Sequence, residues 1–303
     1  MNLPQQGTIH IQPVLPYSFD LTMKEIQWYP LDVTERITGN RLLRGFRLPD
    51  QQTVLTVISD EKNTGLRADM YAGSPVDTQD VSRLVRRILN LDLALTRWYS
   101  RIRPDVPMLQ IIEQLHGFKP VAKPTIFESL VSAILEQQLN VEFACTLETR
   151  LIRKYGTHLK AHSGSVWLFP TPDALASLGY ETLKPLQISS AKSRYIIDIA
   201  RRVADGSLDL ESWHELPDDQ LMRNLLSLRG VGRWTAEYVA MFGYRRYNHA
   251  PAADIGLRNA VTALTDSDEQ LSEEATRAYM DQWAEYRGLA TYYIWHAFAV
   301  GLI

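Results

Sequence analysis

The sequence predicts a small α+β N-terminal domain, an antiparallel sheet with a helix, followed by an all-α domain. Three patterns indicate this order. Short β-prone runs alternate with turn residues up to residue 75, one long helical pattern covers residues 78–102, and nearly everything after Pro124 has helical spacing. We therefore expect an N-terminal mixed α/β domain over residues 1–115 and a helical domain over residues 116–303.

The N-terminal domain is expected to begin as a sheet. Its β-prone runs occupy residues 8–14, 41–48, 53–59 and 66–72, with turn-forming residues between them. The helical pattern that follows carries apolar residues spaced three or four positions apart, at Val81, Leu84, Val85, Ile88, Leu91, Leu95 and Trp98. Such a helix has one apolar face, which we expect to cover the sheet.

Several helix ends are visible in the second domain. Thr125 and Glu128 form a capping box at the start of residues 125–139. A helix at residues 216–228 leads into a glycine-containing turn, and two more helices fill residues 270–302. Other helical segments end on glycines that suit C-caps, namely Gly156, Gly179 and Gly206.

Composition narrows the class of protein. The chain has 303 residues, 45% of them hydrophobic and 22% charged, which is typical of a globular protein with a sizeable core. No apolar run approaches the roughly 20 residues that span a bilayer, and no secretory signal precedes the first β-prone run. A single cysteine, Cys145, excludes both an internal disulfide framework and a four-cysteine iron–sulfur cluster. We expect a reducing, intracellular location.

The net charge of −3 gives no sign of nucleic-acid binding, but the distribution of charge does. Between Arg223 and Arg258 there are six arginines and no lysine against Glu237 and Asp254, a local charge of +4. A basic segment on a mildly acidic protein suits local contact with phosphates, although solvated arginines would give the same pattern.

The segment at residues 228–261 holds the most informative pattern. Gly230 and Gly232 permit a positive φ and a close approach of another backbone, in a tight turn that opens a helix. The amides around Gly230, Gly232 and Thr235 would then point outward without helical partners, as in helix N-termini that bind phosphate. A Gly-x-Gly sequence alone more often forms a simple turn, so the surrounding residues must show whether this turn binds phosphate.

Those residues resemble the helix–hairpin–helix DNA glycosylases, and in particular their bacterial 3-methyladenine DNA glycosylase II branch. The turn and its flanks, about residues 221–243, are followed after a loop by Asp254 at the family's catalytic position, although Arg229 stands where the family usually has proline. The resemblance continues in "AILEQQLNV" and in a pattern near the C-terminus made by Trp283, Arg287, Ala290 and Trp295. It implies a helix–hairpin–helix glycosylase domain in a monomeric, cytoplasmic bacterial protein that acts on duplex DNA with alkylated bases.

The resemblance also implies how the bond is broken. Bifunctional relatives carry a lysine at position 234, which forms a Schiff base with the sugar. Trp234 has no amine, and no lysine follows Lys192, so monofunctional base removal is expected. Asp254 would stabilise the developing positive charge on the sugar and orient water. As an N-cap of the helix that follows, it would also have a purely structural role.

Substrate and DNA contacts follow by family position. An aromatic pocket of Trp234, Tyr238 and Trp295 would favour a cationic, alkylated purine, although aromatics at this spacing often belong to a core. Gln138, or Leu139 beside it, would fill the gap left by the flipped base, unless this turn is only a polar helix end. Arg233, with Gly230, Gly232 and Thr235, would contact the DNA backbone.

Cofactor expectations are few. No cofactor is expected for catalysis, and an iron–sulfur cluster is excluded by composition. The resemblance implies a structural Na+ or K+ at the hairpin, held by the main-chain carbonyls of Leu226, Leu228 and Val231. Two other functions stay open: a non-catalytic helix–hairpin–helix module that only grips duplex DNA, and a glycosylase for oxidised or deaminated bases.

Overall fold

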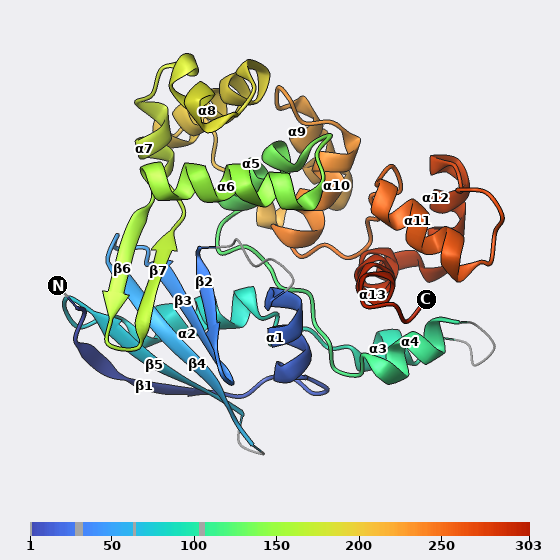
Figure 1. Ribbon diagram of the computed structural model, residues 1–303, viewed down its shortest axis with the longest axis horizontal. Helices are drawn as coiled ribbons and strands as arrows, with labels where there is room; N and C mark the ends of the chain where they lie inside the picture. Colours follow the sequence, from blue (N-terminus) through green and yellow to red (C-terminus); the bar gives the residue numbers. More distant parts are fainter. Residues whose placement is uncertain (1, 28–32, 63–64, 103–106) are drawn as a thin grey trace.

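The computed structural model describes residues 2–27, 33–62, 65–102 and 107–303 of the chain. Its N-terminal part contains a five-stranded antiparallel sheet in the order β1-β5-β4-β3-β2 (Figure 1). The strands are β1 (Gln5–Ile11), β2 (Glu35–Thr38), β3 (Arg41–Arg47), β4 (Thr53–Glu61) and β5 (Gly65–Ala72). The four β-prone runs of the sequence correspond to all strands except β2, and the predicted sheet is confirmed.

One face of the sheet is covered by helices α1 (Phe19–Gln27) and α2 (Thr78–Ile88). Strand β5 alternates buried and more exposed residues, as expected for a strand whose second face is covered less than its first. The predicted helix after the sheet is shorter than its apolar pattern, because α2 ends at Ile88 and a separate short helix α3 (Thr96–Tyr99) follows.

The other face of the sheet is covered by a hairpin that helical periodicity does not predict. Strands β6 (Thr157–Ala161) and β7 (Gly164–Leu168) reach down from the helical part onto β3 and β4 (Figure 1). Leu159, Val166 and Leu168 pack there against Leu43, Leu55 and Val57. Gly45 on β3 permits this contact, because a Cβ at that position would lie 2.7 Å from Leu168 Cδ2.

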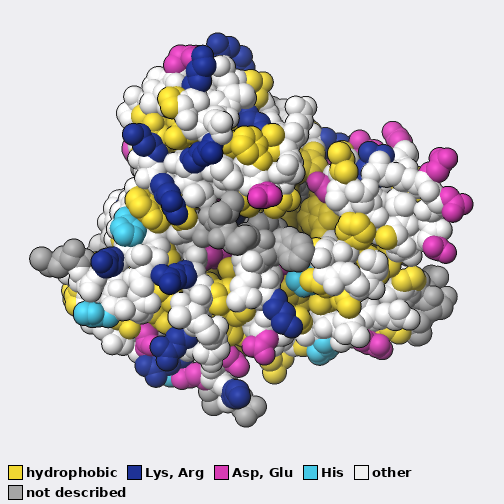
Figure 2. All heavy atoms as spheres, in the orientation of Figure 1, with side chains coloured by type: hydrophobic (Ala, Val, Ile, Leu, Met, Phe, Trp, Pro, Cys, Tyr) yellow, Lys and Arg dark blue, Asp and Glu magenta, His cyan; other side chains and the backbone are white. Residues whose placement is uncertain are grey.

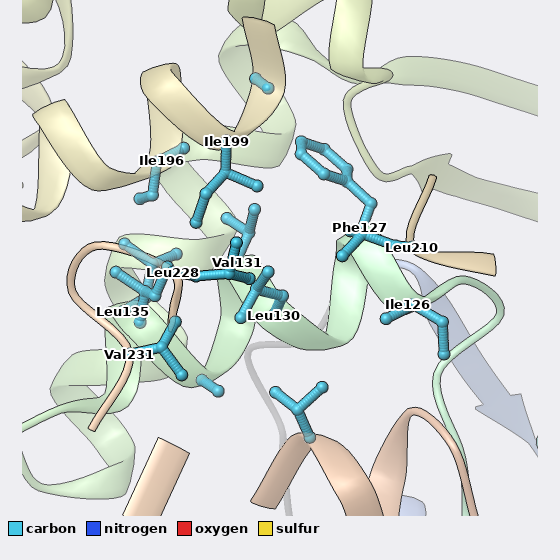
Figure 3. Packing of buried hydrophobic residues seen from close by; sticks show 14 of the residues in the cluster. Ile126, Phe127, Leu130, Val131, Leu135, Ile196, Ile199, Leu210, Leu228 and Val231 are labelled. Carbon is cyan, nitrogen blue, oxygen red and sulfur yellow. The ribbon is translucent and has the colours of Figure 1, made fainter. Parts of the chain in front are cut away.

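The helical part is built around α5 (Ile126–Glu136), and its residues from Ile126 to Leu135 are all buried. Thr125 caps this helix by accepting a hydrogen bond from the Glu128 amide, so the predicted capping box position is confirmed as the helix start. Around it lie α6 (Val141–Tyr155), α7 (Pro172–Ala176), η1 (Tyr180–Leu186), α8 (Ser190–Ala204), η2 (Glu211–Glu215), α9 (Asp218–Ser227) and α10 (Arg233–Phe242). Figure 3 shows the side chains of α5 pointing toward Ile196 and Ile199 of α8 and toward Leu228 and Val231 of the turn after α9.

Two of the three predicted glycine C-caps are found. Gly156 is the C-cap of α6, and Gly206 follows α8 with a φ of 76°, in the left-handed region that favours glycine. Gly179 instead precedes η1, because α7 ends earlier, at Ala176.

The last helices form a third group with part of the N-terminal half. They are α11 (Ile255–Leu264), α12 (Glu273–Met280), η3 (Asp281–Tyr286) and α13 (Arg287–Ala299), and they share a core with α3 and α4 (Met108–Gln114). Trp98 of α3 packs edge-on against Tyr293 of α13, with ring centroids 4.5 Å apart. The division between residues 115 and 116 stays a prediction, and this core crosses it. No helix in the described part of the chain is long and apolar enough to cross a membrane.

Candidate active site

The turn between α9 and α10 uses its two glycines differently. Gly230 has a φ of 87°, and a Cβ there would lie 2.3 Å from the Tyr195 ring on α8, so only glycine fits. Gly232 has φ −90° and ψ −179°, an extended conformation open to any residue, so the expected positive φ holds only for Gly230. A Cβ on Gly232, the N-cap of α10, would meet nothing within 4 Å. The N-terminus of α10 is therefore open on this side.

A side chain that the sequence analysis did not single out fixes this turn. Gln137, just after α5, donates from Nε2 to the carbonyl of Gly230 and to Thr235 Oγ1, both at 2.8 Å. Thr235 is buried, so its hydroxyl faces the protein interior and only its backbone amide is left for the predicted DNA contact. Arg229 lies over the Tyr195 ring, 5.8 Å from its centroid, and ties the turn to α8.

Asp254 is held by three N–H donors. It is the N-cap of α11, where its Oδ1 accepts from the Leu257 amide at 2.8 Å. The indole of Trp234 donates to Oδ2 at 3.0 Å, and the indole of Trp295 donates to Oδ1 at 3.2 Å. The capping role is thus present, and two side chains from other helices orient the same carboxylate.

The loop that carries Asp254 is held by hydrogen bonds from arginine side chains, one of which also forms an ion pair with Glu237. Glu237 on α10 is buried and accepts from Arg277 at 2.8 Å and from Arg233 at 3.1 Å. Arg277 also donates to the carbonyl of Ala250 in the loop, at 3.4 Å. Arg287 donates to the carbonyl of Asn248 in the same loop. Because Arg233 is 60% exposed, its guanidinium stays accessible at the start of α10.

A cavity of about 350 Å³ opens beside Asp254, within the size range of small-molecule sites. Figure 2 shows a recess between the lobe of α5–α10 and the lobe of α11–α13, where hydrophobic side chains gather. The lining of the cavity includes the three aromatic residues predicted for the pocket, Trp234, Tyr238 and Trp295. By contrast, Trp283 and Ala290 of the C-terminal pattern are buried in the core around α13.

The aromatic lining is extended by Phe242, which was not predicted. Tyr238 lies between Trp234 and Phe242, with ring centroids 5.2 Å and 4.5 Å away. Phe242 in turn faces Trp295 at 6.4 Å, with the two rings 15° from parallel. The signal was present in the sequence, since positions 234, 238 and 242 are one helical turn apart and share a face of α10.

Charged groups line another part of the same cavity. They include Glu136 at the end of α5, Glu148 on α6 and Lys123 in the segment before α5, together with Glu25, Glu35 and Arg44. Lys123 lies 3.4 Å from Glu148, which also accepts a hydrogen bond from Ser132. The absence of lysine after Lys192 therefore does not keep amines out of the cavity that Asp254 lines, because the fold brings Lys123 into it from an earlier segment.

Residues 131–285, just over half of the chain, match the model of the HhH-GPD superfamily of base excision DNA repair proteins. The chain belongs to this superfamily. The predicted family and fold class, with the sheet before the helical domain, are confirmed.

Relatives across nearly the whole length agree with this assignment. The chain is 29% identical to a putative DNA-3-methyladenine glycosylase of Bacillus subtilis, over 93% of this chain and 96% of the relative. It is 25% identical to DNA-3-methyladenine glycosylase 2 of Escherichia coli, over 95% and 96% of the two chains. The solved 3-methyladenine DNA glycosylase from Archaeoglobus fulgidus has the same fold, with a TM-score of 0.82, 22% identity and coverage of 96% and 98%.

The predicted wedge residues of this superfamily member lie at the turn between α5 and α6. Gln138 is exposed and has a φ of 57°, a left-handed conformation uncommon outside glycine. Leu139 is 36% exposed and lines the cavity. Both side chains are thus accessible at the mouth of the recess, and which of them enters DNA stays a prediction.

The predicted cation ligands lie at the end of α9 and in the turn after it. The carbonyl of Leu228 accepts from the Val231 amide at 3.0 Å, which leaves its second lone pair for another partner. The carbonyls of the last helical turn, including that of Leu226, lack helical partners by position. The donor set suits a monovalent cation, and its binding there stays a prediction.

Proposed function

We propose that this protein is a monofunctional DNA glycosylase that hydrolyses the N-glycosidic bond of alkylated purines in duplex DNA. One observation carries the proposal: the carboxylate of Asp254 is oriented by Trp234 and Trp295 at the edge of an aromatic-lined cavity. The names of the full-length relatives, both 3-methyladenine glycosylases, support the same substrate class.

The positive charge of the leaving base accounts for the aromatic lining of the cavity. Alkylation of a purine at N3 or N7 gives a cation, which departs without first being protonated. A cation over an aromatic face gains about 0.5–2 kcal/mol, and Trp234, Tyr238 and Phe242 offer such faces in a row. An unmodified, neutral purine lacks this gain, so the lining discriminates for damaged bases.

The charge that develops on the sugar accounts for the carboxylate of Asp254. As the bond to the base breaks, C1′ becomes positively charged and resembles an oxocarbenium ion. A fixed anion such as Asp254 stabilises that charge and orients the water that adds to it. The indole donors hold the carboxylate in place before the reaction, so little reorganisation is needed at the transition state.

The DNA backbone would be gripped at the hairpin. The open N-terminus of α10 offers unpaired amides to a phosphate, with exposed Arg233 beside it. The carbonyls of Leu226, Leu228 and Val231 would hold a Na+ or K+ that supports the turn. Gln138 or Leu139 would fill the space of the flipped base, whose unstacking costs a few kcal/mol. We propose that one monomer does all of this.

The first prediction concerns the products. Incubation with methylated duplex DNA should release 3-methyladenine and 7-methylguanine as free bases, detected by chromatography. A duplex with 8-oxoguanine should release its base far more slowly under the same conditions, because that base is neutral and gains nothing from the aromatic row. Duplex binding without any release would favour the alternative function, a module that only grips DNA.

The second prediction concerns the DNA strand. The product strand should stay intact until it is heated in alkali, and borohydride should trap no covalent complex. The reason is that Trp234 has no amine and that Lys123 is paired with Glu148 in the cavity. A trapped complex would contradict the monofunctional reading, and its loss in Lys123→Gln would identify Lys123 as the amine. Lys154→Gln, on the exposed end of α6, is the matched control.

A further inference from the structure

The side chain of Glu136 forms part of the cavity wall, and the removal of cationic bases does not require its carboxyl group. Glu136 is the last residue of α5, and it is partly accessible through the cavity. The Tyr238 hydroxyl donates to its Oε1 at 3.3 Å. Within the described residues, none of the ion pairs includes Glu136. A carboxyl group that lines an aromatic cavity and belongs to none of these ion pairs calls for a chemical explanation.

The position of Glu136 is tightly fixed by the chain on both sides. Lys192 of α8 donates to the carbonyls of Leu135 and Gln137, each at 2.8 Å. Gln137 is itself bonded to the hairpin through Gly230 and Thr235. Glu136 therefore sits on a rigid support that also positions the DNA-facing turn, as a group that acts on substrate requires.

The surroundings favour the protonated form of this carboxyl group. Burial, followed by the negative charge of Glu148, raises the pKa of Glu136 to about 8, against the opposing effect of Lys123. The other titratable groups that face it are Tyr238, Asp254 and Lys192. The protonated form of Glu136 carries an O–H group, and this residue lines the same cavity as Asp254.

Two carboxyl groups in one site with opposite protonation states commonly divide acid and base roles between them. A neutral damaged purine leaves poorly, because it would depart as an anion unless a proton reaches one of its ring nitrogens. We propose that Glu136 supplies this proton and extends base removal from cationic purines to neutral damaged ones, such as hypoxanthine. This inference rests on the proposed glycosylase function.

The proposed step balances in protons and electrons. The carboxylic proton of Glu136 moves to a ring nitrogen of the purine. The bond between C1′ and N9 breaks, and its electron pair goes to the base, which leaves as a neutral molecule. Water adds to C1′ and gives up a proton, which passes by way of Asp254 to solvent, and Glu136 regains its proton from solvent.

The test compares two lesions in one duplex sequence, hypoxanthine and 7-methylguanine, under single-turnover conditions with enzyme in excess between pH 6 and pH 9. Glu136→Gln keeps the shape of the side chain but cannot transfer a proton. At pH 7 we expect it to slow hypoxanthine release by at least about 100-fold and 7-methylguanine release by less than about threefold. Glu142→Gln, on the exposed first turn of α6, is the matched control and should change neither rate.

The pH profile adds an independent readout. The acid form is the active one, so hypoxanthine release by the unmodified protein should fall as the pH rises through about 8, the pKa of Glu136. The ratio of the variant rate to the unmodified rate cancels any titration of the lesion, and this ratio should rise above pH 8. A ratio independent of pH would overturn the inference.

Other outcomes separate the two proposals. Release of 7-methylguanine without hypoxanthine by the unmodified protein would leave the proposed function intact and refute the role of Glu136. Equal losses on both lesions in Glu136→Gln would refute it as well, because they indicate a general effect on the cavity. Failure to release 7-methylguanine would instead refute the proposed function itself.

Discussion

Asp254→Asn is expected to slow base release by about 10³-fold, while the affinity for duplex DNA changes by less than roughly threefold. The substitution removes the charge and keeps the shape. Asparagine is as good an N-cap as aspartate, so its Oδ1 can still accept from the Leu257 amide and keep α11 in place. The loss therefore reports on the charge that stabilises the sugar cation and on the hydrogen bond from Trp234, because the amide nitrogen that replaces Oδ2 cannot accept it. Base release from methylated DNA and binding to a duplex, measured side by side, check it.

The matched control is the same change at another helix start. Asp77 caps α2 by accepting from the Gln79 amide and is exposed, away from the cavity. Asp77→Asn should leave both base release and thermal stability unchanged. If Asp254→Asn weakened DNA binding as much as it slowed release, the carboxylate would be a structural element of the loop.

Gly230→Ala is expected to destabilise the protein by about 2–5 kcal/mol, the sum of a left-handed backbone and an overpacked contact. The backbone has a φ of 87°, and the new methyl group would meet the Tyr195 ring at 2.3 Å. Relief would require the turn to shift, and Gln137 and Thr235 would shift with it. Urea unfolding measures the effect, and an unchanged midpoint would contradict it.

Gly232→Ala is the matched control two positions later. Gly232 has a φ of −90°, and a Cβ there would lie in open space, so the unfolding free energy should change by less than about 1 kcal/mol. Its methyl group would stand at the N-terminus of α10, where the proposed phosphate contact forms. We expect DNA affinity to fall by about 1.5–3 kcal/mol, the worth of a hydrogen bond to a charged group. The pair thus separates folding from DNA binding at one turn.

Much of this fold could be predicted because its elements are local patterns. The alternation in β5 and the capping box at Thr125 are determined by neighbours in sequence. The same holds for part of the site. Trp234 and Asp254 each stand at the start of a helix, and the chain between them, the rest of α10 and residues 243–253, is short enough to bring the indole and the carboxylate together.

The rest could not be predicted because it depends on distant packing. Hairpin β6–β7 has few buried residues of its own and is stabilised by the sheet that it covers. Lys123 enters the cavity only because the segment before α5 runs beside α6 and α10. Glu136 looks like an ordinary polar helix end in the sequence. The raised pKa of Glu136 arises from burial and from the charge of Glu148, neither of which is visible before the helices are packed.

The core shared by α3, α4 and the last three helices has a consequence for dividing the chain. A fragment that began at residue 116 would lose Leu95, Trp98 and Ile111, and the face of α13 around Tyr293 would become exposed to water. Asp254 caps a helix of that same core, at α11. Residues 116–303 thus depend on α3 and α4, which precede them, for part of their hydrophobic core. Any shortened version should therefore retain α3 and α4.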